Sequence, residues 1–332
     1  MKAILSKVVG GPETLVLEEV PDPVPGPKQV LLAVKACGVN FPDTLIIEDR
    51  YQFRPPRPFS PGGEVAGVVE AVGPEVKSVK VGDRVIGSTG HGGMAEKVVV
   101  DEFRCIPMAE NMPFDEASAF ILTYGTSHHA LKDRGQLKPG ETLLVLGAAG
   151  GVGLAAVELG KAMGARVIGA VSSQEKADLV KARGADDVVI YPQGPFDRDG
   201  RRQLAELFKK ACGEKGADVI YDAVGGDYAE AALRAIAWEG RFLVVGFPAG
   251  IPSLPLNLTL LKGCQVVGVF WGAWVARNPQ GFAASVAELM DFYRRGLVKP
   301  YVSARFPLER AGEAIAHLAA RKALGKVVVV ME

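Results

Sequence analysis

The chain lacks the features that mark several large classes of protein. Among its 332 residues, 38 basic side chains balance 38 acidic ones, so the formal net charge is zero. Without an excess of positive charge, there is no field to attract nucleic acid or an anionic membrane. No apolar run approaches the roughly 18 to 20 residues that a membrane-spanning helix needs, and MKAILSKVVGGPE has no signal-peptide pattern. These absences predict a globular protein of the cytoplasm.

Cysteine and histidine are also scarce, with four of each. The cysteines are scattered and no CxxC pair occurs, so neither a disulfide framework nor a structural zinc cluster is indicated. The cysteines are Cys37, Cys105, Cys212 and Cys264. The histidines are His91, His128, His129 and His317, and we expect structural or surface roles for them. The sequence therefore predicts no metal site.

The pattern of apolar residues changes near residue 125. Before it, short valine-rich runs are separated by glycines, which is typical of an irregular, barrel-like antiparallel unit. After it, six nearly continuous apolar runs alternate with helix-length segments: ETLLVLG, ARVIGAV, DVVIY, ADVIYDAV, RFLVVGF and CQVVGVF. Such runs predict an α/β fold with a doubly wound parallel sheet, because helices would bury both faces of every strand. Helices are expected at 151–164, 174–184, 200–213, 226–239 and 254–263.

A glycine-rich loop follows the first of these strands. The segment 148–153, AAGGVG, has the spacing G-x-G-x-x-G with Ala148 in place of the first glycine. Gly150 would let the backbone approach a pyrophosphate, and Gly153 would let strand and helix pack closely. The start of the helix would supply free N–H groups to the anion. The expected dinucleotide contacts are Ala149, Gly150, Gly151 and Val152.

The second strand ends without the acidic residue that binds a ribose 2′-hydroxyl in NAD-preferring sites. The sequence there is GAVSSQEK, with Ser172 and Ser173 followed by Lys176. A carboxylate would repel a 2′-phosphate, whereas an ammonium and hydroxyls would bind it. The segment therefore favours NADPH. Two alternative interpretations oppose the prediction of NADPH. In one, Lys176 is only a solvated helix residue; in the other, Glu175 points inward.

The chain resembles the medium-chain dehydrogenase/reductase superfamily, and within it the zinc-free quinone oxidoreductases of the ζ-crystallin-like group. The resemblance covers nearly the whole chain and rests on GPETLVLEEVPDPVPGPKQVLLAVKACGVN, PGGEVAGVVEAVGPEV, VGDRVIG, AAGGVGLAAVELGKAMGARVIG, GADDVVIY and GKVVVV. It implies a GroES-like catalytic domain (1–124 and 273–332) split around a Rossmann NADPH-binding domain (125–272). It also implies a homodimer joined edge to edge through strand CQVVGVF.

The resemblance also bears on zinc. Zinc alcohol dehydrogenases of this superfamily place a Cys and a His where this chain has Asn40 and Gly63. A catalytic zinc needs about three protein ligands, and Glu64 with Cys37 does not make such a site. We therefore expect chemistry without a metal.

Site residues follow from the resemblance position by position. It implies catalytic roles for Asn40, Asp43 and Tyr51, with Asn40 also touching the cofactor and Tyr51 capping a substrate carbonyl or the nicotinamide. Where relatives often have a tyrosine, this chain has Leu45, which makes the pocket more apolar. The further cofactor contacts that it implies are Thr126, Tyr191, Gly246, Phe247, Phe270, Trp271, Gly272 and Lys326.

Without a Lewis acid, a hydride acceptor must already be electrophilic, as quinones and α,β-unsaturated carbonyls are. The expected function is therefore an NADPH-dependent, zinc-independent reductase of such small molecules. The stretch EDRYQFRPPRPFS is expected near the mouth of the pocket, favouring a planar or extended acceptor. Two alternatives stay open: an enoyl-CoA reductase of the acrylyl- or crotonyl-CoA type, and a non-catalytic NADPH-binding protein.

Overall fold

The computed structural model describes residues 1–321 and 323–331. The chain forms two compact units. The first unit comprises Met1–Leu122 with Pro300–Glu332, and the second unit is Thr123–Lys299. Each unit has its own sheet and its own core, and each is described separately below.

The second unit keeps a segment, 273–299, that the sequence assigns to the catalytic domain. This segment holds most of α9 (Trp271–Arg277) and all of α10 (Pro279–Arg294). The Ser285 hydroxyl of α10 lies 2.8 Å from Nδ1 of His128, and Phe282 packs edge-on against Trp271 with ring centroids 5.9 Å apart. The apolar face of the predicted amphipathic helix is therefore buried within the second unit, and the chain returns to the first unit only at Pro300.

The sheet of the second unit has six parallel strands in the order β10-β9-β8-β11-β12-β13. Their bounds are β8 Thr142–Leu146, β9 Arg166–Val171, β10 Asp187–Ile190, β11 Ala217–Asp222, β12 Ile236–Val244 and β13 Gln265–Gly268. In chain order this is 3-2-1-4-5-6, the strand order of the doubly wound dinucleotide fold. The predicted Rossmann sheet is confirmed.

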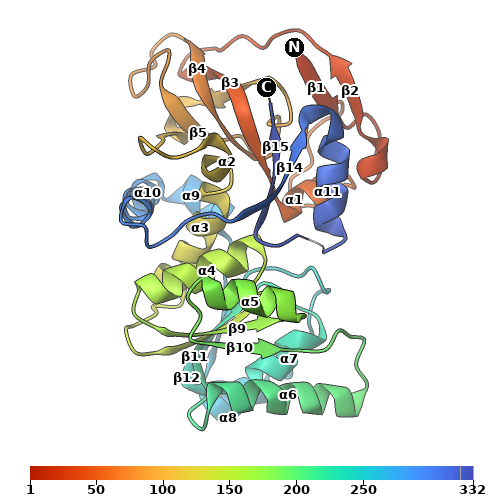
Figure 1. Cartoon of the computed structure of the whole chain (residues 1–332), viewed down its shortest axis with the longest axis vertical. Helices are drawn as coiled ribbons and strands as arrows, with labels where there is room; N and C mark the ends of the chain where they lie inside the picture. The colour runs from red at the N-terminus through yellow and green to blue at the C-terminus, as the bar shows by residue number, and fades with distance from the viewer. Residues whose placement is uncertain (322, 332) are drawn as a thin grey trace. The chain divides into compact units, whose positions relative to one another are not determined.

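Helices cover both faces of this sheet. Figure 1 shows α4 and α5 on one face and α6 and α7 on the other. The helices are α4 Gly151–Ala162, α5 Gln174–Ala182, α6 Arg198–Cys212, α7 Asp227–Leu233 and α8 Asn257–Lys262. Strand β8 shows the result, because its residues Leu143 to Leu146 have no exposed surface. Burial on both faces explains the nearly continuous apolar runs.

One predicted helix is shorter than expected. The segment 226–239 forms α7 only as far as Leu233, and its end is already the start of β12. Ile236 pairs with Ala217, but the next pair is Arg241 with Val219, so β12 carries extra residues in a bulge. Glu239 has a φ of 58° there. The apolar spacing suggested a helix because the bulge interrupts the alternation of the strand.

The first unit contains a seven-stranded sheet in the order β14-β15-β3-β4-β5-β7, with β6 also paired to β3. The strands are β3 Gln29–Val39, β4 Glu64–Val72, β5 Arg84–Ser88, β6 Lys97–Asp101, β7 Cys105–Pro107, β14 Val302–Pro307 and β15 Lys326–Val330; β1 Lys2–Leu5 and β2 Val16–Glu19 form a separate pair. The helices are α1 Phe41–Ile46, α2 Phe114–Ala117 and α11 Ala311–Ala319. Helix α3, Ile121–His128, follows α2.

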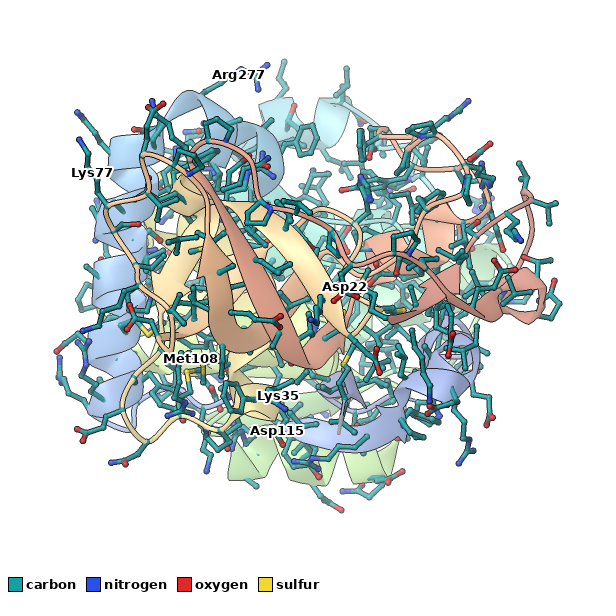
Figure 2. All side chains as sticks on the ribbon, turned by 90° about the horizontal axis from the view of Figure 1, so that it is seen from above. Asp22, Lys35, Lys77, Met108, Asp115 and Arg277 are labelled. Carbon is teal, nitrogen blue, oxygen red and sulfur yellow. The ribbon has the colours of Figure 1, made fainter. Side chains whose placement is uncertain are left out.

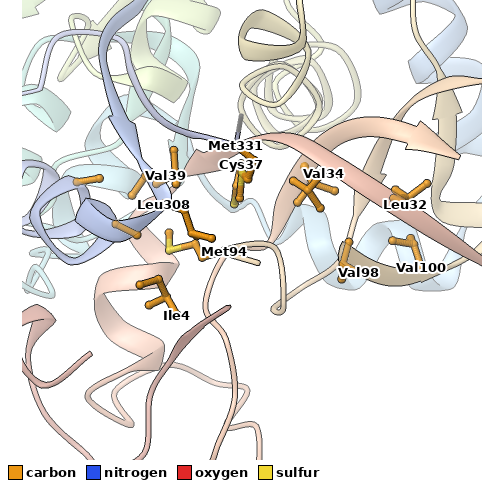
Figure 3. Close-up of a cluster of buried hydrophobic side chains, with 14 of the residues drawn as sticks. Ile4, Leu32, Val34, Cys37, Val39, Met94, Val98, Val100, Leu308 and Met331 are labelled. Carbon is orange, nitrogen blue, oxygen red and sulfur yellow. The ribbon is translucent and has the colours of Figure 1, made fainter. Parts of the chain in front are cut away.

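Strands β3 and β15 form the centre of this unit. They run antiparallel, with Val327 opposite Val39 and Val329 opposite Cys37. Their inward side chains join Ile4, Met94 and Leu308 in one buried cluster (Figure 3). This pairing places the start of β15 beside the end of β3, where the predicted catalytic residues begin.

Charged side chains are mostly exposed; among the described residues, the buried exceptions are Asp43, Glu64, Glu158, Asp222 and Lys326. Lys77 in the first unit and Arg277 in the second are exposed, and both point outward in Figure 2. All four cysteines are free and buried. Within residues 1–321 and 323–331, no helix is long and apolar enough to cross a membrane.

Candidate functional site

The glycine-rich loop forms the N-terminus of α4. Gly150 caps the helix in an extended conformation, with φ −80° and ψ 169°. A Cβ placed on Gly150 would meet only the Gly147 oxygen, at 3.4 Å, so the space in front of the helix is open. The first N–H groups of a helix have no partner within it. The loop therefore fits an anion such as a pyrophosphate, as the sequence predicts.

Gly153 has the opposite surroundings. A Cβ there would overlap the Gly147 carbonyl oxygen and would come within 2.9 Å of the Ala148 Cα, both of which are backbone atoms. We expect Gly153→Ala to lower the free energy of unfolding by about 1–3 kcal/mol, because α4 must move away from β8. Guanidinium unfolding would measure the loss. Gly150→Ala is the matched control, and an equal loss in both variants would contradict this account of close packing.

The end of β9 brings together a cation and a hydroxyl. Ser173 caps α5, and its Oγ accepts from the Lys176 backbone N–H at 3.3 Å. This turn carries the Lys176 side chain back to the strand end, where Nζ lies 3.1 Å from Ser172 Oγ. Glu175 is exposed. Ser172 and Lys176 thus form a compact donor pair at the position where an acidic residue would bind a ribose 2′-hydroxyl.

Tyr191 follows β10 and belongs to an aromatic cluster. Its ring lies 5.0 Å from that of Tyr228 and 6.2 Å from that of Phe208. Only 8% of the residue is exposed. Most of the ring is therefore core, and its predicted contact with a 2′-phosphate stays a prediction.

The predicted nicotinamide contacts of the second unit lie beyond the ends of β12 and β13. Gly246 and Phe247 follow β12, and the Phe247 residue is 41% exposed. Phe270 and Gly272 follow β13 and are exposed too. Since β12 and β13 are neighbours, the structure brings these residues to one edge of the sheet.

Trp271 is buried and lies against α3. Its indole Nε1 has no hydrogen-bond partner within the described residues. A Cβ on Gly125 would come within 2.8 Å of the indole ring, so the ring lies directly on Gly125, next to the predicted contact Thr126. The unpaired N–H is therefore buried against α3.

Asp222, which the sequence did not single out, organises the end of β11. Its Oδ1 accepts the backbone N–H groups of Val224 and Gly225, each at 2.9 Å. Its carbonyl accepts those of Val245 and Gly246. Asp222 therefore holds the loop after β11 and the loop after β12 together. The only signal in the sequence was an acidic residue ahead of two glycines, which is too common to predict such a role.

Burial gives Asp222 a measurable signature. It raises the pKa of the carboxyl from its ordinary 3.8 to about 6. The folded state therefore binds the proton more tightly than the unfolded state, so this contribution to stability is present below pH 3.8 and is lost as the pH rises through 6.

We expect Asp222→Asn to remove about 2–3 kcal/mol of pH dependence between those limits. The amide oxygen keeps both backbone bonds, because one oxygen accepts both. Guanidinium unfolding of both proteins from pH 4 to 7.5 measures the two slopes. The stability difference at the acidic end, where the wild-type carboxyl is already neutral, is the internal control. Parallel slopes would rule out this titration.

In the first unit, Asn40 and Asp43 start α1. The Asn40 backbone N–H donates to Asp43 Oδ2 at 2.7 Å, and the Gly62 N–H donates to Asp43 Oδ1 at 2.9 Å. Both carboxylate oxygens are thus used to hold the backbone. Burial raises the pKa of Asp43 to about 6, while these bonds and the charge of Lys326 oppose the rise.

Lys326 reaches Asn40 from β15. Its Nζ donates to Val39 O at 3.0 Å and to Asn40 Oδ1 at 2.5 Å, and lies 3.9 Å from Glu64 Oε2. The Asn40 amide in turn donates to Gly38 O at 3.2 Å and to Glu64 Oε2 at 3.4 Å. Asn40 is 5% exposed, Glu64 1% and Lys326 5%. The polar groups of Asn40 and Lys326 are thus already bonded inside the first unit, and their contact with a cofactor stays a prediction.

Glu64, which the sequence left without a role, completes this network. Its second oxygen, Oε1, accepts the Leu122 N–H at 2.9 Å. Burial raises the pKa of Glu64 and lowers the pKa of Lys326, and their mutual attraction opposes both shifts. We call Asn40, Asp43, Glu64 and Lys326 the buried network.

The charge of Asp43, a member of this network, acts on the Tyr51 phenol. Tyr51 is half-buried and packs on the core of the first unit. Burial raises the pKa of its phenol, and the charge of Asp43 raises it further. Tyr51 therefore stays protonated at neutral pH and keeps an O–H to donate.

The residues of the buried network do not fit a zinc ion. The Asn40 amide and the Glu64 carboxylate are engaged in hydrogen bonds, and Gly63 has no side chain to offer. Burial and the charges of Asp43 and Glu64 raise the pKa of Cys37 well above its usual range, which opposes the thiolate form that zinc binds. In the part of the chain that is described, no group of three or more His, Cys, Asp or Glu could hold a metal ion.

Comparisons with known proteins agree with this geometry. Residues 26–110 match the alcohol dehydrogenase GroES-like domain, and residues 151–291 match the zinc-binding dehydrogenase family. Quinone oxidoreductase-like protein 2 of Rattus norvegicus is 39% identical over 96% of this chain and 89% of its own. Quinone oxidoreductase of Homo sapiens is 34% identical over 95% and 92%. The Escherichia coli quinone oxidoreductase complexed with NADPH superposes with a TM-score of 0.90 at 29% identity, covering 99% of this chain and 100% of that one.

Proposed function

Since the chain belongs to the zinc-free quinone oxidoreductase group of the medium-chain dehydrogenase/reductase superfamily, we propose that it is an NADPH-dependent reductase of quinones or α,β-unsaturated carbonyls. The observation that carries the proposal is the 3.1 Å contact between Lys176 Nζ and Ser172 Oγ at the end of β9. A cation and a hydroxyl there bind a 2′-phosphate, which NADH lacks, through charge-assisted hydrogen bonds.

Backbone and aromatic groups of the second unit are assigned to the cofactor. In the second unit, the N–H groups at the start of α4 bind the diphosphate, and the open space at Gly150 lets the backbone approach it. The rings of Phe247 and Phe270, both partly exposed, exclude water from the nicotinamide.

Bound NADPH supplies a hydride. The chain itself must stabilise the negative charge that develops on the acceptor oxygen, and a positioned donor does this where no metal acts. We assign the donor role in the first unit to Tyr51, because its half-buried phenol packs on the core of that unit and carries an O–H at neutral pH. Asp43 and the rest of the buried network hold α1 in place.

The experiment is a screen of NADPH consumption against quinones, enones, nitroalkenes and enoyl-CoA thioesters, with wild type and Tyr51→Phe. We expect turnover of quinones or enones, and a kcat about tenfold lower in the variant with a smaller change in KM. Faster turnover of a CoA thioester than of any quinone or enone would favour the enoyl-CoA reductase instead. Tight NADPH binding with no turnover on the panel would favour a non-catalytic NADPH-binding protein.

We also propose a homodimer joined along β13. This strand is the edge of its sheet, and its Val266 is 41% exposed. Helix α8 adds Leu260 at 78% and Leu261 at 63% exposed, so apolar surface gathers where a sheet edge offers unpaired backbone. Sedimentation should show a dimer for wild type and monomers for Val266→Lys. Val24→Lys, at a residue 85% exposed in the first unit, is the control and should stay dimeric.

A further inference from the structure

We propose that Phe53 and His91 form a stacking surface in the first unit that selects acceptors with a planar aromatic ring system. The inference rests on the proposed reductase function and names the class of acceptor within it. Phe53 lies on the irregular segment between α1 and β4, and His91 on the loop between β5 and β6. The two rings come from parts of the chain that no local pattern connects.

The rings are already stacked on each other. Their centroids are 5.7 Å apart with an interplanar angle of 26°. His91 also meets the edge of Phe59, at 6.0 Å and 76°. Offset stacks and edge-on contacts are the preferred arrangements of aromatic pairs. The three rings therefore form one ordered group, in which Phe53 is the outer member.

The His91 end of the stack is fixed by the backbone. The Gly92 N–H donates to Ser60 O at 2.6 Å, and the Met94 N–H donates to Pro61 O at 2.9 Å. The Thr89 hydroxyl donates to Gly62 O at 2.8 Å. His91 is thus attached to the segment 60–62, and Asp43 holds the same segment through the Gly62 N–H. The His91 loop and Asp43 of the buried network are therefore bonded to the same backbone segment, 60–62.

The Phe53 end remains available to a ligand. Half of the Phe53 residue, 50%, is exposed, although phenylalanine is among the residues most often buried. Tyr51, the proposed donor, is two residues earlier on the same segment. Phe53 and the proposed donor therefore share one short segment of the chain.

The chemistry of the stack suits an electron-poor ring. Burial lowers the pKa of His91, so both rings are uncharged at neutral pH. The face of a phenyl ring is electron-rich, and a fused quinone offers it an electron-poor face of matching shape. A short enone or the acyl chain of a thioester has no such face. Phe53 and His91 therefore favour aromatic quinones over small aliphatic enones.

The test compares 9,10-phenanthrenequinone with 3-buten-2-one as acceptors for wild type and Phe53→Leu. Loss of a stacked ring should lower the ratio of the two kcat/KM values, quinone over enone, by about threefold to tenfold. His91→Ala should lower it similarly, whereas Phe53→Tyr and His91→Phe should keep it. Phe103→Leu, at a phenylalanine of the same unit that is 63% exposed, is the matched control. A ratio that stays within twofold in both Phe53→Leu and His91→Ala overturns the proposal.

Calorimetric binding of 9,10-phenanthrenequinone to the NADP⁺-loaded protein separates this inference from the proposed function. If wild type binds the quinone more tightly than Phe53→Leu but does not reduce it, the stacking surface is correct and the reductase assignment fails. If wild type reduces the quinone and both variants bind it equally well, only the stacking surface fails.

Discussion

Replacing Lys326 by methionine is expected to lower the free energy of unfolding by about 3–5 kcal/mol, the range for breaking a buried ion pair on one side. The ammonium group is bonded to Val39 O and Asn40 Oδ1 and lies 3.9 Å from Glu64. Without it, the Glu64 carboxylate and the Asn40 oxygen lose a partner inside the first unit, where water cannot replace it. Guanidinium unfolding at pH 7.5 would measure the loss.

Two further variants make this result specific. Lys35→Met changes a partly exposed lysine of β3, labelled in Figure 2, and should alter stability by less than about 0.5 kcal/mol. Adding Glu64→Gln to Lys326→Met removes the unpaired carboxylate and should restore part of the lost stability. If Lys326→Met lowers the free energy of unfolding no more than Lys35→Met does, the buried network does not stabilise the first unit.

Replacing Lys176 by glutamate is expected to weaken NADPH binding by about 30-fold to 300-fold, because a charge-assisted bond is replaced by repulsion of the 2′-phosphate. NADH, which has a hydroxyl at that position, should lose less than about threefold. Fluorescence titration of the two reduced cofactors measures both constants. Ser172→Ala should give a smaller loss in the same direction, since it removes one hydroxyl and leaves the ammonium.

The control for this prediction lies on the same helix. Lys181 is exposed, and its Nζ donates to the Asp186 carbonyl rather than toward Ser172. Lys181→Glu should therefore change both affinities little. A loss for NADPH in Lys181→Glu as large as in Lys176→Glu would mean that the general charge of the unit, and not the pair at the end of β9, attracts the phosphate.

The second unit could be predicted from the sequence because its determinants are local. Each buried strand is a continuous apolar run, and the glycine loop lies between a strand and a helix in one short segment. The pair of Ser172 and Lys176 is local as well, since a residue and its neighbour four positions on share one turn. The sequence did not predict the bulge in β12 at Glu239, where a positive φ interrupts the strand. It also did not predict that the second unit extends to Lys299.

The first unit resisted prediction because its contacts are distant in sequence. Asn40 and Lys326 are separated by 286 positions, and only the pairing of β3 with β15 brings them together. The stack of Phe53 on His91 likewise joins two loops that are far apart in the sequence. The resemblance did indicate Asn40, Asp43 and Tyr51, but it did not reveal that the Asn40 amide is occupied by Glu64 and Lys326.

The most direct test of the central claim is calorimetric titration of the wild-type protein with NADPH and with NADH under the same conditions. If Lys176 and Ser172 bind a 2′-phosphate, NADPH should bind at least about tenfold more tightly. The preference should shrink as salt is raised, because the ionic part of the contact is screened. NADH binding as tightly as NADPH, or more tightly, would contradict the account.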